Sequence, residues 1–312
     1  MFYEYAVDPK CFANWDSFRL LIGQFGWKQG RLISKFPRNW KKRVHDIIQE
    51  NQINNKKLTF MQHQKITDEL EKNIFIKSNQ RFDSSNCDWL NNAIHNITVF
   101  RAIIAYDNLE ICDKVLIASE LIPDDFLWKV EFTDIIPSTP DELCKCVEKL
   151  LQESSEILFI DPYFFRRDKA KDRLRWLTTL EKFIAVVNKK EDTFLQYHLE
   201  ISDEEYFKPE EKRKEDFQKE CDKEIKKLLP YGRIITFFRW KKIDHSGDKF
   251  HARYVLTNLG GVWFDVGLDK GKSGETTNVA RLEDKVWNSR FNSFKEGSKV
   301  YEFVDKVDVI GE

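Results

Sequence analysis

The order of helical and strand-like segments in the second half of the chain constrains its fold most. From residue 139 onward the pattern is helix, strand, helix, helix and then three further strands. Helices that alternate with strands are typical of domains in which helices cover a mixed sheet. The sequence therefore predicts an α/β fold (an α+β mixed sheet) in a domain of about 170 residues, which is a usual domain size.

The start of this domain is marked by a helix-initiation signal that begins at Ser138. Thr139 is suited to cap a helix, Pro140 suits the first helical position, and Glu142 completes a capping box. A signal of this kind favours a domain boundary directly before it. The expected domains are residues 1–137 and residues 138–312.

The first 137 residues contain helical patterns and then a few strand-like segments. Val44, Ile47 and Ile48 recur at helical spacing, and a second helical run covers residues 67–76. Further along, segments rich in Val, Ile and Phe predict strands. These segments are residues 98–105, 114–118 and 129–136. We therefore expect a mainly helical N-terminal region with a few strands, and the role of this region as a whole stays open.

A local excess of positive charge lies between Lys28 and Lys57. The segment holds nine Lys or Arg residues against Asp46 and Glu50, whereas the whole chain is nearly balanced, with 51 basic and 52 acidic residues. Aromatic residues interleave these charges, as they do in surfaces that contact nucleic-acid phosphates. The alternative is a solvated helical face. The residues expected to bind nucleic acid are Lys28, Arg31, Arg38, Lys41, Lys42 and Arg43.

The composition argues against several other classes of protein. No apolar run approaches the roughly 20 residues that a membrane helix needs, and the N-terminal residues lack the pattern of a secretion signal. The six cysteines include no CxxC pair, so a structural zinc site is not expected. Scattered reduced thiols are typical of the cytoplasm. We therefore expect a cytoplasmic protein with no metal and no cofactor.

The residues that suggest chemistry lie between positions 244 and 284. His251 and Arg253 stand at the head of an apolar strand, Asn258 follows the arginine by five residues, and Asp269 ends a Gly-Leu-Asp segment after a second strand. A histidine and a guanidinium on one strand face are suited to bind or attack a phosphate group. The alternative for His251 is a structural histidine within a strand.

Two further segments belong to the same expected site. The strand 157–160 ends at Asp161, which places a carboxylate at a sheet edge, where α/β folds build their sites. Downstream, Glu275, Thr276 and Thr277 are suited to close a phosphate pocket with hydroxyl groups. The alternatives are that Asp161 caps the strand end and that the threonines are ordinary loop residues.

Together these motifs resemble the phospholipase D superfamily. His251, Arg253 and Asn258 parallel its histidine–lysine–aspartate motif, and Gly267-Leu268-Asp269 stands where its members often carry a glycine, a serine and an asparagine. The resemblance is closer to the phospholipase-D-like C-terminal domain of MIT-domain proteins. That domain is similar in its histidine, arginine and asparagine, its Gly-Leu-Asp, its Glu-Thr-Thr and its upstream Asp-Pro-Tyr, which Arg166 and Arg167 follow here.

This resemblance implies a metal-independent reaction at phosphorus. In the superfamily one histidine attacks phosphorus to form a phosphohistidine, a second histidine protonates the leaving oxygen, and cations stabilise the other oxygens. The chain has one such motif, with only His245 nearby, so catalysis would require a homodimer. The resemblance implies catalytic roles for His251, Arg253, Asn258 and Asp269. It implies phosphate binding by Arg253, Thr276, Thr277 and Asp161.

Three functions remain open at this point. The first is a phosphodiesterase, in particular a nuclease, which would suit defence against foreign DNA. The second is a non-catalytic module that binds anionic membrane lipid or a partner protein, and the third is a structural subunit with a vestigial pocket. Asn258 replaces a carboxylate and Leu268 replaces a small hydroxyl residue, which weakens catalysis more than binding, because Arg253 still grips phosphate.

Overall fold

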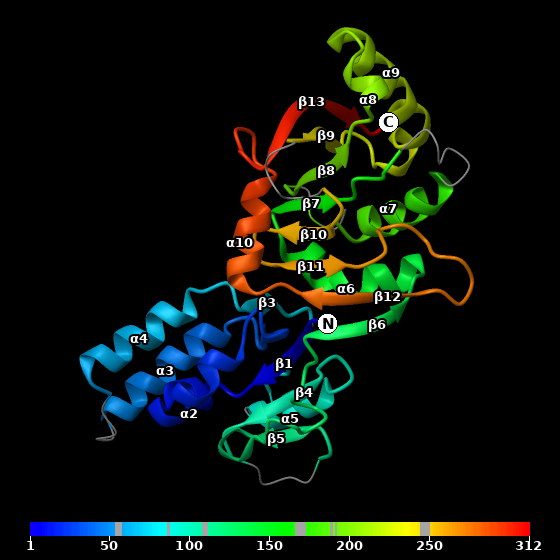
Figure 1. Cartoon of the computed structure of the whole chain (residues 1–312). Coiled ribbons are helices and arrows are strands. Elements are labelled where there is room, and N and C mark those ends of the chain that lie inside the picture. Colours follow the sequence, from blue (N-terminus) through cyan, green and yellow to red (C-terminus); the bar gives the residue numbers. More distant parts are fainter. Residues whose placement is uncertain are drawn as a thin grey trace. The chain divides into compact units, whose positions relative to one another are not determined.

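The structure is a computed structural model of the whole chain, and its placed residues form two compact units. It describes residues 1–312 except 54–57, 86–87, 108–111, 166–172, 188–189, 191 and 244–249. The units are Met1–Phe132 and Thr133–Glu312, each built on its own sheet (Figure 1). The predicted α/β fold with a mixed sheet is confirmed. Lys56, Lys57, Arg166, Arg167 and His245 lie outside the described residues.

The N-terminal unit contains a five-stranded parallel sheet in the order β3-β2-β1-β4-β5. Its strands are β1 (Tyr3–Val7), β2 (Arg31–Lys35), β3 (Phe75–Lys77), β4 (Ala102–Ala105) and β5 (Val115–Ile117). The expected mainly helical region is therefore not observed. Strands buried on both faces of a parallel sheet do not alternate apolar with polar residues, so β1 and β2 lack the period-two signal. The strand β3 lies at the end of a run that looked helical.

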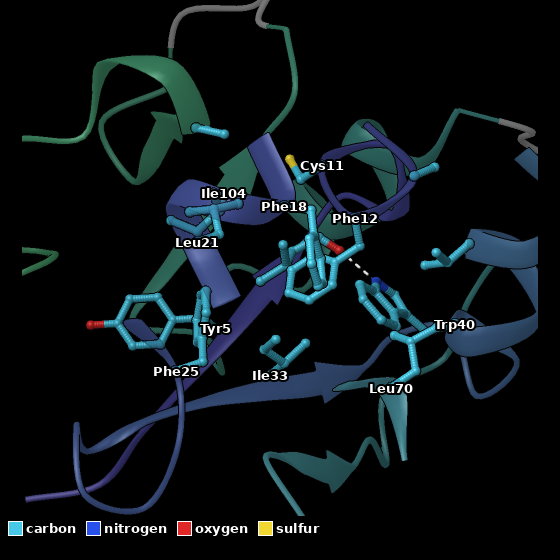
Figure 2. Packing of buried hydrophobic residues seen from close by; sticks show 14 of the residues in the cluster. Tyr5, Cys11, Phe12, Phe18, Leu21, Phe25, Ile33, Trp40, Leu70 and Ile104 are labelled. Atoms are coloured by element: carbon cyan, nitrogen blue, oxygen red, sulfur yellow. Dashed lines mark hydrogen bonds between the residues drawn. The ribbon is translucent and has the colours of Figure 1, made fainter. Parts of the chain in front are cut away.

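Helices cover both faces of this sheet. They are α1 (Pro9–Ala13), α2 (Trp15–Leu21), α3 (Trp40–Ile53), α4 (Phe60–Leu70) and α5 (Trp89–His95), with the short 3-10 helices η1 (Ile22–Gln24) and η2 (Ala118–Glu120). Because side chains alternate along a strand, Tyr5 packs with α1 to α4, whereas Ala6 packs with Trp89 of α5. Figure 2 shows the first cluster, in which the Trp40 indole donates a hydrogen bond to the Val7 carbonyl at 2.6 Å.

The C-terminal unit contains an eight-stranded mixed sheet in the order β13-β9-β8-β7-β10-β11-β12-β6. The strands are β6 (Thr133–Pro137), β7 (Glu156–Ile160), β8 (Phe194–Glu200), β9 (Ile234–Lys242), β10 (Arg253–Thr257), β11 (Gly261–Phe264), β12 (Thr276–Arg281) and β13 (Tyr301–Ile310). The central strands β7, β8 and β9 are parallel, and the flanking pairs are antiparallel. β7 therefore pairs with a parallel strand on one side and with antiparallel β10 on the other.

The helices of this unit begin with α6 (Pro140–Glu153), where the sequence predicted one. The Thr139 hydroxyl accepts a hydrogen bond from the Glu142 amide at 3.3 Å. The remaining helices are α7 (Arg173–Val187), α8 (Asp203–Tyr206), α9 (Glu210–Glu224), η4 (Lys226–Leu228) and α10 (Asp284–Ser293). The unit begins at Thr133 rather than at residue 138, because β6 pairs with β12 and belongs to the second sheet. Among the described residues, no helix is long and apolar enough to cross a membrane.

Candidate functional site

The candidate site lies where the end of β7 meets the start of β10. The two strands are antiparallel, with Tyr254 opposite Ile160, so the residues after β7 lie beside those that lead into β10. The Tyr163 hydroxyl hydrogen-bonds Nδ1 of His251, and their rings stack with centroids 6.0 Å apart and planes 15° apart. The Arg253 guanidinium carbon lies 4.7 Å from the Tyr163 ring centroid. The structure thus brings a histidine, a phenol and a guanidinium together.

Asp161 hydrogen-bonds backbone amides of the two segments next to these side chains. Its side chain is buried, and one oxygen accepts a hydrogen bond from the Tyr163 amide at 3.0 Å. The other oxygen accepts from the Trp176 indole at 3.1 Å and from the Leu268 amide at 3.2 Å. Burial raises the pKa of Asp161, and these N–H donors and Arg253 oppose that rise. Because donors occupy both oxygens, Asp161 positions the site rather than offering a contact to phosphate.

Asp269 lines the same cavity as Asp161 and forms an ion pair. Its carboxylate lies 3.0 Å from the Arg175 guanidinium, whose Nε donates to the Lys270 carbonyl at 2.6 Å. Gly267 precedes it with a φ of +153°, and a Cβ there would lie 2.4 Å from an Asp269 oxygen. Only glycine fits this approach without displacing the carboxylate. Asp269 therefore joins the predicted site, as the ion-pair partner of a helix arginine.

These residues line a cavity of about 160 Å³. Two arginines, Arg175 and Arg253, line it. The N–H groups of Arg253 do not all have a hydrogen-bond partner among the described residues. Its Nη1 donates to the Asp265 carbonyl at 3.2 Å, whereas its buried Nε has no hydrogen-bond partner among the described residues. Leaving a buried donor unmet costs about 1–3 kcal/mol, so this N–H is suited to bind an acceptor group of a ligand. The lining residues are Asp161, Tyr163, Arg175, Trp176, Arg253, Val266 and Asp269.

Asn258 does not join His251, which corrects the expected catalytic set. It follows the last residue of β10, and at roughly 3.3 Å per strand residue it lies on the order of 20 Å from His251. Its side-chain oxygen accepts hydrogen bonds from the Ser155 amide at 3.0 Å and the Glu156 amide at 3.2 Å. Asn258 therefore fixes the start of β7 against the end of β10.

The two threonines lie on β12, two strands away from β10 in the sheet. Thr277 is buried, and its hydroxyl accepts a hydrogen bond from the Val266 amide at 3.3 Å, whereas Thr276 is exposed. Neither lines the cavity. Thr277 supports Val266, which does line it, so the expected phosphate-binding role of the pair is replaced by an indirect one for Thr277.

Two of the basic residues predicted to bind nucleic acid, Arg31 and Lys41, have partners within the protein. Arg31 donates to the Trp128 carbonyl at 2.9 Å and the Gln24 carbonyl at 3.1 Å, and burial lowers its pKa. Lys41 lies 3.6 Å from a Glu71 oxygen. The others differ in exposure: Lys28 and Arg43 are half-buried, and Arg38 and Lys42 are exposed.

Sequence reasoning missed two residues that complete the site. In the sequence Tyr163 stands out only as part of an Asp-Pro-Tyr motif, and Arg175 lies in α7, where no motif marks it. No local pattern identifies either one, because their partners lie 88 and 95 residues further along the chain. In the part of the chain that the structure describes, no group of three His, Cys, Asp or Glu residues is placed to hold a metal ion.

Comparison with known proteins gives little beyond this geometry. No family model matches the chain, and no curated protein matches it. The chain is similar to the solved structure of TrmBL2, an archaeal chromatin protein that shows a novel mode of DNA binding, with a TM-score of 0.26 and 15% sequence identity. The alignment covers 53% of this chain and 53% of TrmBL2. Similarity at this level does not establish a shared fold.

Proposed function

We propose that the C-terminal unit recognises a phosphodiester at the cavity beside His251 and cleaves it without a metal ion. The observation that carries the proposal is Arg253, whose buried Nε lacks an acceptor while its guanidinium lies over the Tyr163 ring that stacks on His251. A phosphate oxygen is the acceptor that a guanidinium fork fits best. Arg253 would then hold the non-bridging oxygens within reach of the imidazole.

The contact between Tyr163 and His251 suits a histidine nucleophile. When Nδ1 carries the ring proton, it donates to the phenol oxygen, and Nε2 keeps the lone pair that attacks phosphorus. The nitrogen–phosphorus bond forms as the ester oxygen departs, and that oxygen takes a proton from an acid. Water then hydrolyses the phosphohistidine. Arg253 stabilises the charge on the phosphoryl oxygens during both steps.

The acid that protonates the leaving oxygen must come from a second source. His198 is the other histidine in the described part of this unit, and it lies in the core, where it accepts a hydrogen bond from the Trp240 indole at 2.9 Å. Burial lowers the pKa of His198 to about 3, so its ring is neutral near pH 7 and is not an imidazolium that could act as the acid. A second copy of the chain would supply the second histidine, which makes a homodimer part of the proposal.

Hydrolysis in the presence of EDTA tests the proposal. Wild-type protein would be incubated with single-stranded DNA, RNA and bis(4-nitrophenyl) phosphate, beside His251→Asn and, as a matched control, His95→Asn, which replaces an exposed histidine of the other unit. We expect turnover that His251→Asn lowers at least about 100-fold and that the control leaves unchanged. Absence of turnover on all three substrates, or turnover that EDTA abolishes and His251→Asn does not, would contradict cleavage.

One observation favours recognition without cleavage. The described partner of His251 Nδ1 is a phenol rather than a carboxylate, and a phenol does not stabilise an imidazolium by charge. The ligand would then be an anionic lipid headgroup. Flotation with liposomes that contain phosphatidylserine, at low salt, tests this alternative. Arg253→Gln should abolish flotation if the site binds the headgroup, and failure of the wild type to float would remove this function.

A further inference from the structure

The N-terminal sheet has a crevice at its carboxyl edge that the proposed function does not use. The chain runs from β1 outward to β2 and β3, then crosses back to β4 and β5, so the strand order reverses between β1 and β4. All five strands are parallel, and the loops after β1 and β4 therefore leave the same edge in opposite directions. In open α/β sheets, ligands bind in the crevice at this reversal.

A cavity of about 670 Å³ lies at this reversal. Asp8 comes directly after β1, Asp107 comes shortly after β4, and Trp89 begins α5. One face of α3 forms the opposite wall, with Arg43, Asp46, Ile47 and Glu50 at helical spacings of three and four. The volume lies within the range of about 300–1,000 Å³ that is usual for small-molecule sites.

A second cavity, of about 510 Å³, lies beside the first at the ends of β2 and β3, and Arg43 lines both. Arg38, Arg43 and Arg81 reach this second cavity. Arg43 packs over the Phe82 ring at 4.4 Å, and within the described chain none of the three guanidiniums forms an ion pair. Three unpaired arginines around one concavity are suited to bind an anion bidentately.

The remaining arginines of this unit are held by the protein itself. Arg19 pairs with Asp16 at 3.2 Å, Arg31 binds two carbonyls, and Arg101 donates to the Phe126 carbonyl at 2.7 Å. The unpaired arginines are therefore not spread evenly over the unit. They gather at the carboxyl edge of the sheet, next to the larger cavity.

We propose that the two joined cavities bind a phosphorylated nucleoside. The phosphate would lie between Arg38, Arg43 and Arg81. The nucleoside would enter the larger cavity, where Asp46 and Glu50 accept hydrogen bonds from its hydroxyl and amino groups and the base packs on apolar side chains such as Ile47. Arg43 stands at the junction of the two halves. This site is separate from the His251 site and does not depend on the function proposed there.

Equilibrium binding to the full-length protein tests this proposal. Calorimetric titrations would use AMP, GMP, CMP, UMP, inorganic phosphate and a 5′-phosphorylated hexadeoxynucleotide. We expect at least one nucleoside monophosphate to bind at least about tenfold more tightly than inorganic phosphate. Tighter binding of the hexanucleotide would identify a strand end as the ligand, and tighter binding of a monophosphate would identify a free nucleotide.

Variants separate the two halves of the site. Arg43→Gln and Arg38→Gln should each lower the affinity for every phosphorylated ligand by about tenfold or more, because each removes a charged phosphate contact. The double variant Asp46→Asn/Glu50→Gln should bind nucleotides no more tightly than inorganic phosphate. Its affinity for inorganic phosphate itself should be unchanged. Lys42→Gln is the matched control, since Lys42 is exposed on α3 beside Arg43 and lines neither cavity. We expect it to change affinity less than about twofold.

Several results would overturn the proposal. One is that none of the nucleotides binds at about 1 mM. Another is that Lys42→Gln and Arg38→Gln weaken binding equally, because that indicates unspecific attraction to positive charge. Arg38 is exposed, so its replacement tests the site even if Arg43→Gln disturbs folding. Finally, loss of binding in Arg253→Gln would place the ligand in the C-terminal unit instead.

Discussion

The polar residues at the edges of the two sheets differ in how they are paired. In the C-terminal unit the polar side chains bind one another: Asp161 accepts three N–H donors, Asp269 pairs with Arg175, and the cavity that remains is about 160 Å³. In the N-terminal unit, charged groups such as Arg38 and Asp46 face cavities of about 510 and 670 Å³ and form no ion pairs with described residues.

The difference follows from strand direction. β7 and β10 are antiparallel, so the segment that follows β7 lies beside the segment that precedes β10. The polar side chains of this region can therefore hydrogen-bond one another. β1 and β4 are parallel, and their following loops diverge, which leaves charged side chains apart. A frame of mutual hydrogen bonds contributes to stability, whereas separated charges contribute mainly to binding. Substitutions in the two units test that distinction.

The largest expected effect is on the free energy of unfolding when Asp161 is removed. Asp161→Ala leaves three buried N–H donors without their acceptor, and each unmet donor costs about 1–3 kcal/mol, so we expect a loss of at least about 3 kcal/mol. Asp46→Ala should change stability by less than about 0.5 kcal/mol, because its exposed carboxylate pairs with no described residue. Urea denaturation measures both, and equal losses would refute the distinction.

The pH dependence of stability tests the interior of the C-terminal unit. The pKa of His198 is lowered from 6.5 to about 3 by burial, so below pH 6.5 the unfolded chain binds a proton that the folded chain does not. Stability is therefore lost as the pH falls, by about 2 kcal/mol from this group between pH 7 and pH 5. In urea denaturation, the free energy of unfolding of His198→Gln should fall by about 2 kcal/mol less between pH 7 and pH 5 than that of the wild type or of His251→Asn. An unchanged pH slope in His198→Gln would contradict a neutral, buried His198.

Arg253 is expected to contribute more to binding than to folding, unlike the rest of its frame. Arg253→Gln removes one carbonyl hydrogen bond and also a buried donor that has no partner, so stability should change by less than about 1 kcal/mol. Affinity for a phosphodiester, measured by calorimetry with dinucleotides, should fall at least about tenfold, which corresponds to about 1.4 kcal/mol. A large loss of stability with unchanged affinity would make Arg253 a structural residue.

The smallest effects should separate two arginines that the sequence grouped together. Arg31→Gln removes hydrogen bonds to two carbonyls and the contact with the Trp128 ring at 4.4 Å, so it should cost about 1 kcal/mol of stability. Arg38→Gln should stay within about 0.5 kcal/mol, since the side chain is exposed. Thermal denaturation of the two variants side by side checks this. The reverse order would mean that Arg38 supports folding.

Much of the C-terminal unit follows from local sequence. The hydroxyl of Thr139 caps α6 where the sequence predicts a helix start, because a cap depends on residues only three positions apart. The apolar run that follows Arg253 likewise forms a strand, β10, as its residues predict, although His251 itself lies in the turn before that strand. The strand patterns likewise predicted most of the order from residue 139 onward, and with it the α/β class.

Tertiary structure decided the rest. The strands β4 and β5 lie within the predicted segments 98–105 and 114–118, whereas β1 and β2 were missed because they are buried on both faces and carry no alternation to detect. Asn258 lies far from His251 because five strand residues intervene, whereas Tyr163 meets it across 88 residues of sequence. Sequence composition also cannot tell Arg31 from Arg38. Only the packed structure determines which guanidinium finds a carbonyl and which one faces a cavity, because each partner comes from a distant part of the chain.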